Sequence, residues 1–173
     1  VTACATGTHS VGEAYRTISG GHADAIIAGG AEAAITPLAF AGFGNAMALS
    51  GAEDPALASL PFDARRKGFV MGEGAGMLVL EEKQHAIARG ARIYAQVAGY
   101  GNTCDAYHIT APSPDGKMGA AAIEAAMKEA GITDKCTDFK NVYINAHGTG
   151  TLLNDKCETQ AIKKVLGEDA YNV

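Results

Sequence analysis

Several features are absent from the 173-residue sequence, and each absence argues against a class of protein. No apolar run approaches the roughly 20 residues needed to cross a bilayer. The first residues, VTACATG, hold neither an initiator methionine nor a charged leader before an apolar stretch. We therefore expect no membrane association and a location in the cytoplasm, or in the stroma or matrix of an organelle.

Paired cysteines are also absent. The four cysteines are spread along the chain without a CxxC motif, which argues against a zinc ribbon, any other metal site and a thioredoxin-like redox module. We expect reduced thiols. Cysteine often serves as a small buried hydrophobic residue, and this is our interpretation of Cys104, Cys136 and Cys157.

Charge is scarce, with 19% charged residues and a net charge of −5. The one short basic cluster is Arg65, Arg66 and Lys67, which we place on a surface loop. A nucleic-acid-binding protein would show a much larger basic patch, so that class is not expected. With 47% hydrophobic residues, the chain has enough apolar content for a sizeable core.

The apolar pattern of the first half alternates between helix and strand. Helical spacing predicts a helix from about Cys4 to Ser19, ended by a glycine pair. The run at 25–28 is apolar throughout, which is typical of a strand buried on both faces of a parallel sheet. Thr36 and Pro37 predict the start of a helix that reaches about Leu49.

The same alternation continues to the end of the chain and predicts an α/β fold with βαβ units. In the final helix, Asp155 and Glu158 have the spacing of a capping pair. The remaining expected elements are a long structured loop at 50–69, strands at 77–80, 93–97 and 142–145, and helices at 81–89 and 118–130.

Two loops carry residues with useful chemistry. Cys4 lies among small residues at a predicted helix N-terminus, where free amides and the helix dipole stabilise a thiolate and an oxyanion. His147 follows a predicted strand in the loop NAHGTGT, and functional sites collect at such strand ends. Together the two form a candidate nucleophile and its partner, or two unrelated structural residues. The histidines without companion ligands are interpreted as ordinary structural residues: His9, His22 and His85.

Five ordered motifs resemble the β-ketoacyl-acyl carrier protein synthases, and among them most closely the synthase II type of fatty-acid synthesis. The motifs are TACATGTHSVGEA at 2–14, DAIIAGGAEAAITP at 24–37, PFDARRKGFVMGEGAGMLVLEE at 61–82, DAYHITAP at 105–112 and INAHGTGT at 144–151. The resemblance implies a thiolase-like layered αβαβα architecture, incomplete here. It divides the chain into the end of an N-terminal half, 1–89, and the start of a C-terminal half, 90–173.

The resemblance also implies an acyltransferase activity, the decarboxylating condensation of fatty-acid elongation. Cys4 matches the nucleophile that takes the acyl chain, and His147 matches a histidine that assists the decarboxylation of malonyl-acyl carrier protein. No cofactor is implied apart from the phosphopantetheine of acyl carrier protein, which is the expected partner. The family is usually dimeric, so we expect a homodimer in the full-length protein.

The resemblance assigns five further positions to substrate binding. Thr149 and Thr151 match residues that contact the phosphopantetheine arm, with loop capping as the alternative use of their hydroxyls. Asp105 and His108 resemble a loop at the mouth of the substrate channel. Phe43 resembles the lining of the acyl pocket.

Two alternatives within the resemblance stay open: a ketosynthase of polyketide or polyunsaturated fatty-acid synthesis, and a non-catalytic subunit that shapes chain length. The second lacks the nucleophile that Cys4 supplies. The family's second histidine and its lysine fall outside the 173 residues, so we expect these residues alone to show little condensing activity. Leu152 replaces a usual proline and Lys67 a usual aspartate, which predicts a looser loop after His147 and a lost charge pair.

Overall fold

The computed structural model describes residues 2–132 and 139–173, so the interpretation of Cys136 lies outside the described residues. The first helix, α1, spans Thr6–Ser19 and follows a short 3-10 turn, η1, at Ala3–Ala5. It ends where Gly21 takes a φ of +73°, a conformation open to glycine at little cost. The predicted helix beginning close to Cys4 is confirmed.

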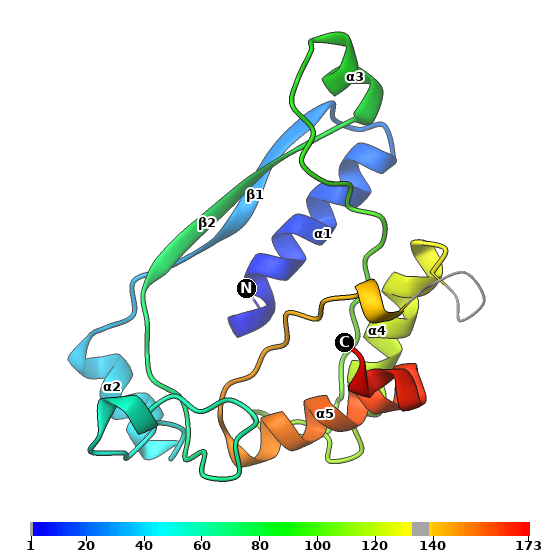
Figure 1. The fold of residues 1–173 in the computed structure, drawn as a ribbon. Helices are drawn as coiled ribbons and strands as arrows, with labels where there is room; N and C mark the ends of the chain where they lie inside the picture. The colour runs from blue at the N-terminus through cyan, green and yellow to red at the C-terminus, as the bar shows by residue number, and fades with distance from the viewer. Residues whose placement is uncertain (1, 133–138) are drawn as a thin grey trace.

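The strand after α1 forms a two-stranded antiparallel sheet. β1, Ala25–Glu32, pairs with β2, Gly74–Glu81, in a register that runs from Ala25 opposite Glu81 to Glu32 opposite Gly74. The prediction of a parallel strand buried on both faces is therefore wrong for the described residues. α1 covers one face of this sheet (Figure 1). Ala14, Ala28 and Leu80 are buried between them, while Ile27 and Val79 on the other face are exposed.

α2 spans Pro37–Asn45 and begins as predicted, because the Thr36 hydroxyl accepts a hydrogen bond from the Ala39 amide at 3.3 Å. It ends before Leu49, since Met47 takes a left-handed φ of +52°. The loop that follows contains one 3-10 turn, η2, at Pro55–Leu57. A bridge between Leu49 and Phe69 closes it, so the long structured loop is confirmed.

The second half is helical within the described ranges. α3, Lys83–Ala88, and α4, Lys117–Glu129, lie where helices were predicted, and α5, Leu152–Leu166, packs against α4. Two short turns, η3 at Phe139–Asn141 and η4 at Gly167–Tyr171, flank α5. None of the helices in the described ranges is long and apolar enough to cross a membrane.

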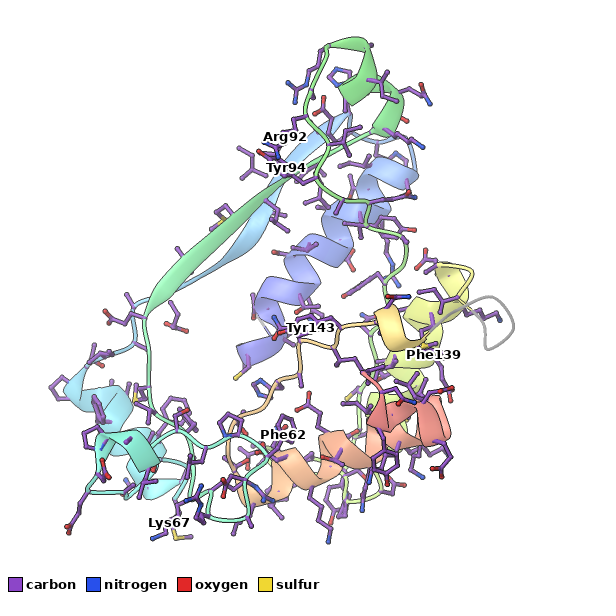
Figure 2. All side chains as sticks on the ribbon, in the orientation of Figure 1. Phe62, Lys67, Arg92, Tyr94, Phe139 and Tyr143 are labelled. Atoms are coloured by element: carbon purple, nitrogen blue, oxygen red, sulfur yellow. The ribbon has the colours of Figure 1, made fainter. Side chains whose placement is uncertain are left out.

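The prediction of strands at 93–97 and 142–145 is wrong. Both segments are described, and neither pairs with another strand among residues 2–132 and 139–173. Arg92 instead stacks over the Tyr94 ring at 4.7 Å, and Tyr143 is 86% exposed (Figure 2). An apolar run becomes a strand only where a partner supplies its hydrogen bonds.

Glu81, at the end of β2, makes the fold sensitive to acid. Its carboxylate accepts hydrogen bonds from Arg89 at 2.6 and 2.7 Å and lies against the His85 ring. The Arg89 bonds, with His85 adding to them, lower the pKa of Glu81 to about 2. Because the folded-state pKa lies below the unfolded value of about 4.3, this stabilisation is present above pH ~4.3 and is lost as the pH falls toward 2.

Urea unfolding of the complete gene product between pH 2 and 6 checks this. Glu81→Gln should flatten part of the fall in unfolding midpoint below pH ~4.3, since the amide does not titrate there. The exposed Glu53 offers a matched control, and Glu53→Gln should leave the curve unchanged. Equal acid sensitivity of wild type and Glu81→Gln would contradict the assignment.

Candidate active site

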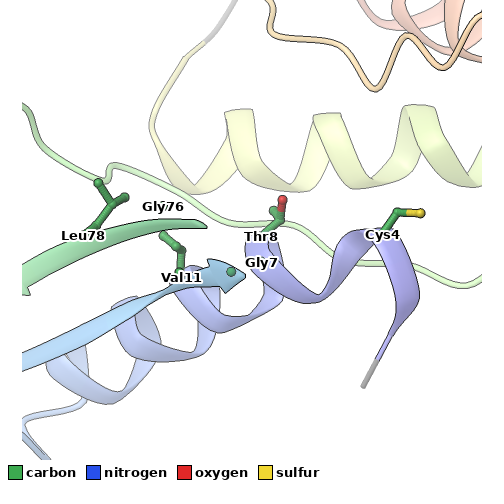
Figure 3. A pocket seen from close by; sticks show the side chains of 8 residues that line it. Cys4, Gly7, Thr8, Val11, Gly76 and Leu78 are labelled. Carbon is green, nitrogen blue, oxygen red and sulfur yellow. The ribbon is translucent and has the colours of Figure 1, made fainter. Parts of the chain in front are cut away.

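Cys4 lies on the η1 turn directly ahead of α1 and is exposed. It opens onto a hollow of about 440 Å³ that is formed by the start of α1 and the ends of both strands (Figure 3). Small residues dominate the lining, so the backbone is accessible to a ligand. The residues around the hollow are Cys4, Gly7, Thr8, Val11, Gly29, Gly30, Gly76 and Leu78.

Two contacts bring the start of α1 close to β1. A Cβ on Gly30 would lie 3.3 Å from the Cα of Gly7, so this approach needs small residues. The Ser10 hydroxyl donates to the Gly29 carbonyl at 2.6 Å and accepts from the Gly29 amide at 3.0 Å. These contacts fix the helix that carries Cys4 against the edge of the sheet.

The loop that carries His147 is anchored through its backbone by a carboxylate of α5. Glu158 accepts hydrogen bonds from the amides of His147 at 2.6 Å and Gly148 at 2.9 Å. Gly148 and Gly150 have φ values of +51° and +76°, which residues with a Cβ rarely adopt. The His147 side chain is left exposed.

A second carboxylate, Asp155, is only 2% exposed and holds the same loop to the segment around Phe62. It accepts hydrogen bonds from the amides of Phe62 at 2.7 Å and Gly150 at 3.1 Å. Phe62 lies beside α5 in Figure 2, and its ring would be 3.1 Å from a Cβ on Gly148. Two parts of the chain that are distant in sequence therefore meet at one buried carboxylate.

Arg66 completes this anchor. Its guanidinium donates to the carbonyls of Thr151 at 3.2 Å and Leu152 at 3.0 Å, and its Nε lies 3.6 Å from the Asp155 carboxylate. Placing Arg66 on a surface loop with Arg65 is therefore wrong, because only 16% of its side chain is exposed. Arg65 does lie at the surface and pairs with Asp63 at 2.8 Å.

The capping pair predicted for α5 is also wrong. Thr151 caps this helix, since its hydroxyl accepts from the Asn154 amide at 3.3 Å, while Asp155 and Glu158 point to the loop. The sequence signal for their true role is two acids three residues apart that closely follow a glycine-rich loop, whose amides they bind.

The threonine hydroxyls of the loop bind to each other, with 2.9 Å between the oxygens of Thr149 and Thr151. The capping role that was the alternative for Thr151 is thus seen. Contact of either hydroxyl with a phosphopantetheine arm stays a prediction.

The other predicted substrate residues lie away from the hollow at Cys4, whose lining includes none of them. Asp105 accepts from the Ser113 amide at 2.7 Å, and His108 Nδ1 accepts from the amides of Thr110 and Ala111 at 3.1 and 3.0 Å. Phe43, on α2, packs edge-on against Phe69 with 5.2 Å between ring centroids. Their substrate roles stay predictions.

The remaining described cysteines differ from each other. Cys104 is exposed, so its interpretation as a buried hydrophobic residue is wrong. Cys157 is half-buried and donates to the Ser113 carbonyl at 3.2 Å. Burial, together with the nearby charge of Asp105, raises the pKa of the Cys157 thiol, which favours the unreactive protonated form.

Cys4 and His147 come from different parts of the fold. In the view of Figure 1, the segment 142–151 runs from η3 toward the start of α5 and passes the N-terminal end of α1. His147 is not among the described residues that line the hollow at Cys4, so their joint action stays a prediction. The described residues contain no group of three or more histidine, cysteine, aspartate or glutamate side chains arranged for a metal ion.

Leu152 occupies the first position of α5, where proline is favoured. Thr151 before it is extended, with φ −83° and ψ 149°, which suits a residue preceding proline. Leu152→Pro should therefore raise the free energy of unfolding by about 0.4–1 kcal/mol, mainly by restricting the unfolded chain. Urea unfolding of the complete gene product measures it.

Leu153→Pro is the matched control, since Leu152 and Leu153 are 63% and 62% exposed. It should destabilise, because the residue before it would be the helical Leu152. If both substitutions destabilise equally, the loop and helix start do not have the geometry described.

Comparison with known proteins finds two family models that match the chain. Residues 1–86 match the family model of the β-ketoacyl synthase N-terminal domain, and residues 94–173 match that of the β-ketoacyl synthase C-terminal domain. The chain is 55% identical to 3-oxoacyl-acyl-carrier-protein synthase 2 of Synechocystis sp. over 174 residues, and 56% identical to that of Vibrio cholerae over 168. These two alignments include 100% and 96% of this chain, but only 41% and 40% of the length of the relatives.

Solved structures of ketosynthases have the same fold. One is a ketosynthase of a type II polyketide synthase in complex with its acyl-carrier protein, with 42% identity and a TM-score of 0.91 over 98% of this chain and 41% of that one. Another is a β-ketoacyl synthase from Burkholderia phymatum, with 41% identity and a TM-score of 0.87 over 95% of this chain and 39% of that one. The fold class, a partial thiolase-like α/β architecture, is confirmed. The chain belongs to the β-ketoacyl synthase family.

Proposed function

We propose that the protein containing this chain is a β-ketoacyl-acyl carrier protein synthase of fatty-acid elongation, with Cys4 as its nucleophile. The observation that carries the proposal is an exposed cysteine that opens onto a hollow at a helix start, in a chain 55% identical to 3-oxoacyl-acyl-carrier-protein synthase 2. The chain spans about two-fifths of the relatives it matches, 41% of the first, so the activity is proposed for the complete gene product.

The reaction has two stages at Cys4. Its thiolate attacks the thioester of an acyl carrier protein, so that a new acyl–sulfur bond forms and the pantetheine thiol leaves with a proton. Malonyl-acyl carrier protein then loses carbon dioxide, and the electron pair of the broken bond forms an enolate. The enolate carbon attacks the acyl-Cys4 carbonyl, the carbon–carbon bond forms and the Cys4 thiolate is released.

The role assigned to His147 is to donate a hydrogen bond to the enolate oxygen as the negative charge develops. A donor about 3 Å from the developing oxyanion is worth several kcal/mol in a site that excludes water. The double anchor of the loop supports this assignment, because the bonds to Glu158 and Asp155 fix the backbone from which the imidazole projects. Thr149 and Thr151 lie on the same anchored loop, where their hydroxyls would meet the phosphopantetheine arm.

The proposal includes acyl carrier protein as the partner, which agrees with the solved complex of a related ketosynthase with its carrier protein. It also includes a homodimer, a cytoplasmic or organellar location, and two halves that meet near residues 89 and 90. Asp105, His108 and Phe43 are assigned to the channel mouth and acyl pocket of the complete protein.

A polyketide ketosynthase is the second candidate, because solved polyketide relatives superpose well. The higher identity to the fatty-acid enzymes, 55% against 42%, favours elongation. A chain-length subunit, as in the ishigamide ketosynthase and chain length factor complex, is disfavoured by the presence of Cys4.

The test separates the two stages in the complete gene product. Wild type should load an acyl group on Cys4 and release carbon dioxide from malonyl-acyl carrier protein, with products extended by one two-carbon unit per cycle. His147→Ala should lower carbon dioxide release by about 100-fold or more while acyl loading stays within about threefold. His22→Ala, at an exposed histidine after α1, is the matched control.

Two results would overturn the proposal. Equal loss of loading and decarboxylation in His147→Ala would remove the assigned role. If the wild-type protein loads no acyl group, the proposed enzymatic function is wrong, and a chain-length subunit becomes the better candidate.

A further inference from the structure

We propose that His9 is a positioning residue for Cys4: its imidazole, held by Tyr100, binds Thr2 and so fixes the strained turn that presents the thiol. The inference rests on the proposed function for its purpose, but its geometry is independent of it. Nothing in the sequence singled out His9, which had been interpreted as an ordinary structural histidine.

The turn that carries Cys4 has a strained backbone. Ala3, directly before the cysteine, has a φ of +49°, a conformation that residues with a Cβ adopt rarely and only where the surroundings enforce it. The adjoining Thr2 and the rest of the turn are exposed, so burial does not enforce it. The contacts of Thr2 are therefore the means by which the turn is held.

Thr2 is bound at three points. Its amide donates to the Thr6 hydroxyl at 2.8 Å, and its carbonyl accepts from the Ala5 amide at 3.2 Å. Its hydroxyl shares a hydrogen bond with His9 Nδ1 at 2.6 Å, the shortest of its contacts, and also lies 3.4 Å from the Thr6 hydroxyl. The first two bonds come from residues of the turn and the first turn of α1, whereas the third reaches seven residues along the chain.

The His9 ring is itself held in place by Tyr100. Its ring meets Tyr100 edge-on, with 6.4 Å between centroids and an interplanar angle of 82°. Tyr100 is only 8% exposed and lies so close to α1 that a Cβ on Gly12 would be 2.3 Å from its ring. The Arg16 guanidinium also stacks over the Tyr100 ring, 4.8 Å from its centroid. A rigid aromatic side chain thus supports the imidazole, and the imidazole supports Thr2.

The contacts of Thr2 determine where the Cys4 thiol lies. The cysteine lies between the strained Ala3 and the start of α1, so release of Thr2 would let Ala3 relax to a common φ and swing the thiol away from the hollow. Reactive groups tolerate such displacement poorly, because small misplacements lower rates strongly.

Variants of the complete gene product can isolate the Nδ1 bond. In His9→Asn the side-chain amide reaches the position of Nδ1, whereas in His9→Gln it reaches that of Nε2. His9→Gln and Thr2→Val should each slow alkylation of Cys4 by iodoacetamide about 5–10-fold, the expected effect of one lost hydrogen bond. His9→Asn should stay within about twofold of wild type. Cys104, exposed on another segment, is the internal reference in every sample.

The double variant His9→Gln/Thr2→Val should be no slower than Thr2→Val alone, since Thr2→Val already removes the bond to His9 together with the 3.4 Å contact to the Thr6 hydroxyl. Ala3→Gly should make the His9→Gln effect smaller, because glycine adopts a positive φ without strain and the turn then depends less on the bond to Thr2. The acyl-loading rate should follow the alkylation rate, with the Michaelis constant for the carrier protein unchanged.

A merely structural histidine would lower the melting temperature while the ratio of Cys4 to Cys104 alkylation stayed constant; that result, or equal behaviour of His9→Asn and His9→Gln, overturns the inference. If wild type shows no acyl loading, the proposed function fails, yet the alkylation ratios still decide the role of His9.

Discussion

Cys4→Ala is expected to abolish condensation, with a loss of at least about 1,000-fold in the complete gene product. The substitution removes the sulfur that forms the acyl intermediate, and no other side chain on the hollow can replace it. The nearest hydroxyl in the lining, that of Thr8, is a far weaker nucleophile than a thiolate. Mass spectrometry after incubation with acyl-acyl carrier protein should show no mass increase in the variant.

The control for Cys4 lies within the same chain. Cys104 is also exposed, so Cys104→Ala removes a thiol of similar accessibility that no proposed step uses. It should retain acyl loading and condensation within about twofold, since surface substitutions have small effects. If Cys104→Ala loses loading and Cys4→Ala keeps it, the nucleophile has been assigned to the wrong cysteine.

The outcome at Cys4 bears on how much of this site can be predicted from the sequence. The helix after Cys4 was predictable because its signals are local: helical apolar spacing and a glycine pair at the end. The same holds for the cap of α2, where Thr36 and Pro37 are adjacent. Motif resemblance then supplied Cys4 and His147, which local spacing alone left as two unrelated residues.

The failures concern pairings that span the sequence. The direction of β1 depends on β2, about 50 residues later, and a continuous apolar run, although typical of parallel strands, does not fix the direction of its partner. The segments at 93–97 and 142–145 have strand-like sequences, yet they find no strand partner among the described residues. Strand formation is a property of two segments, and a sequence pattern reports on one.

The anchors of the His147 loop were missed for the same reason. Asp155 and Glu158 have the spacing of a local capping pair, and nothing nearby indicates that one of them binds an amide 93 residues away at Phe62. Arg66 was grouped with its basic neighbours by sequence, although its contacts are with Thr151 and Leu152. A hydrogen bond between a side chain and a distant part of the backbone leaves no periodic pattern or fixed residue spacing in the sequence.

This non-local anchor carries the second large expected effect. Asp155→Ala should lower the free energy of unfolding by about 3–5 kcal/mol, as expected when one partner of a buried ionic contact is removed. The Phe62 and Gly150 amides would lose their acceptor, and Arg66 would lose the carboxylate 3.6 Å from its Nε. The denaturation midpoint in urea measures the loss, and Asp169→Ala, at an exposed aspartate of η4, should stay within about 0.5 kcal/mol of wild type.

Asp155→Asn separates the loop's role from overall stability. The amide keeps the size of the side chain but places a donor toward one of the two amides that the carboxylate served, at a cost of about 1–3 kcal/mol. At a temperature where this variant is fully folded, carbon dioxide release should fall about 10-fold or more while acyl loading on Cys4 is kept, because the His147 loop has lost one of its two anchors and Cys4 makes no contact with Asp155 in the described part of the chain. Loss of both activities in parallel would mean that Asp155 supports the whole fold and not the loop, and the two-anchor account of His147 would then have to be abandoned.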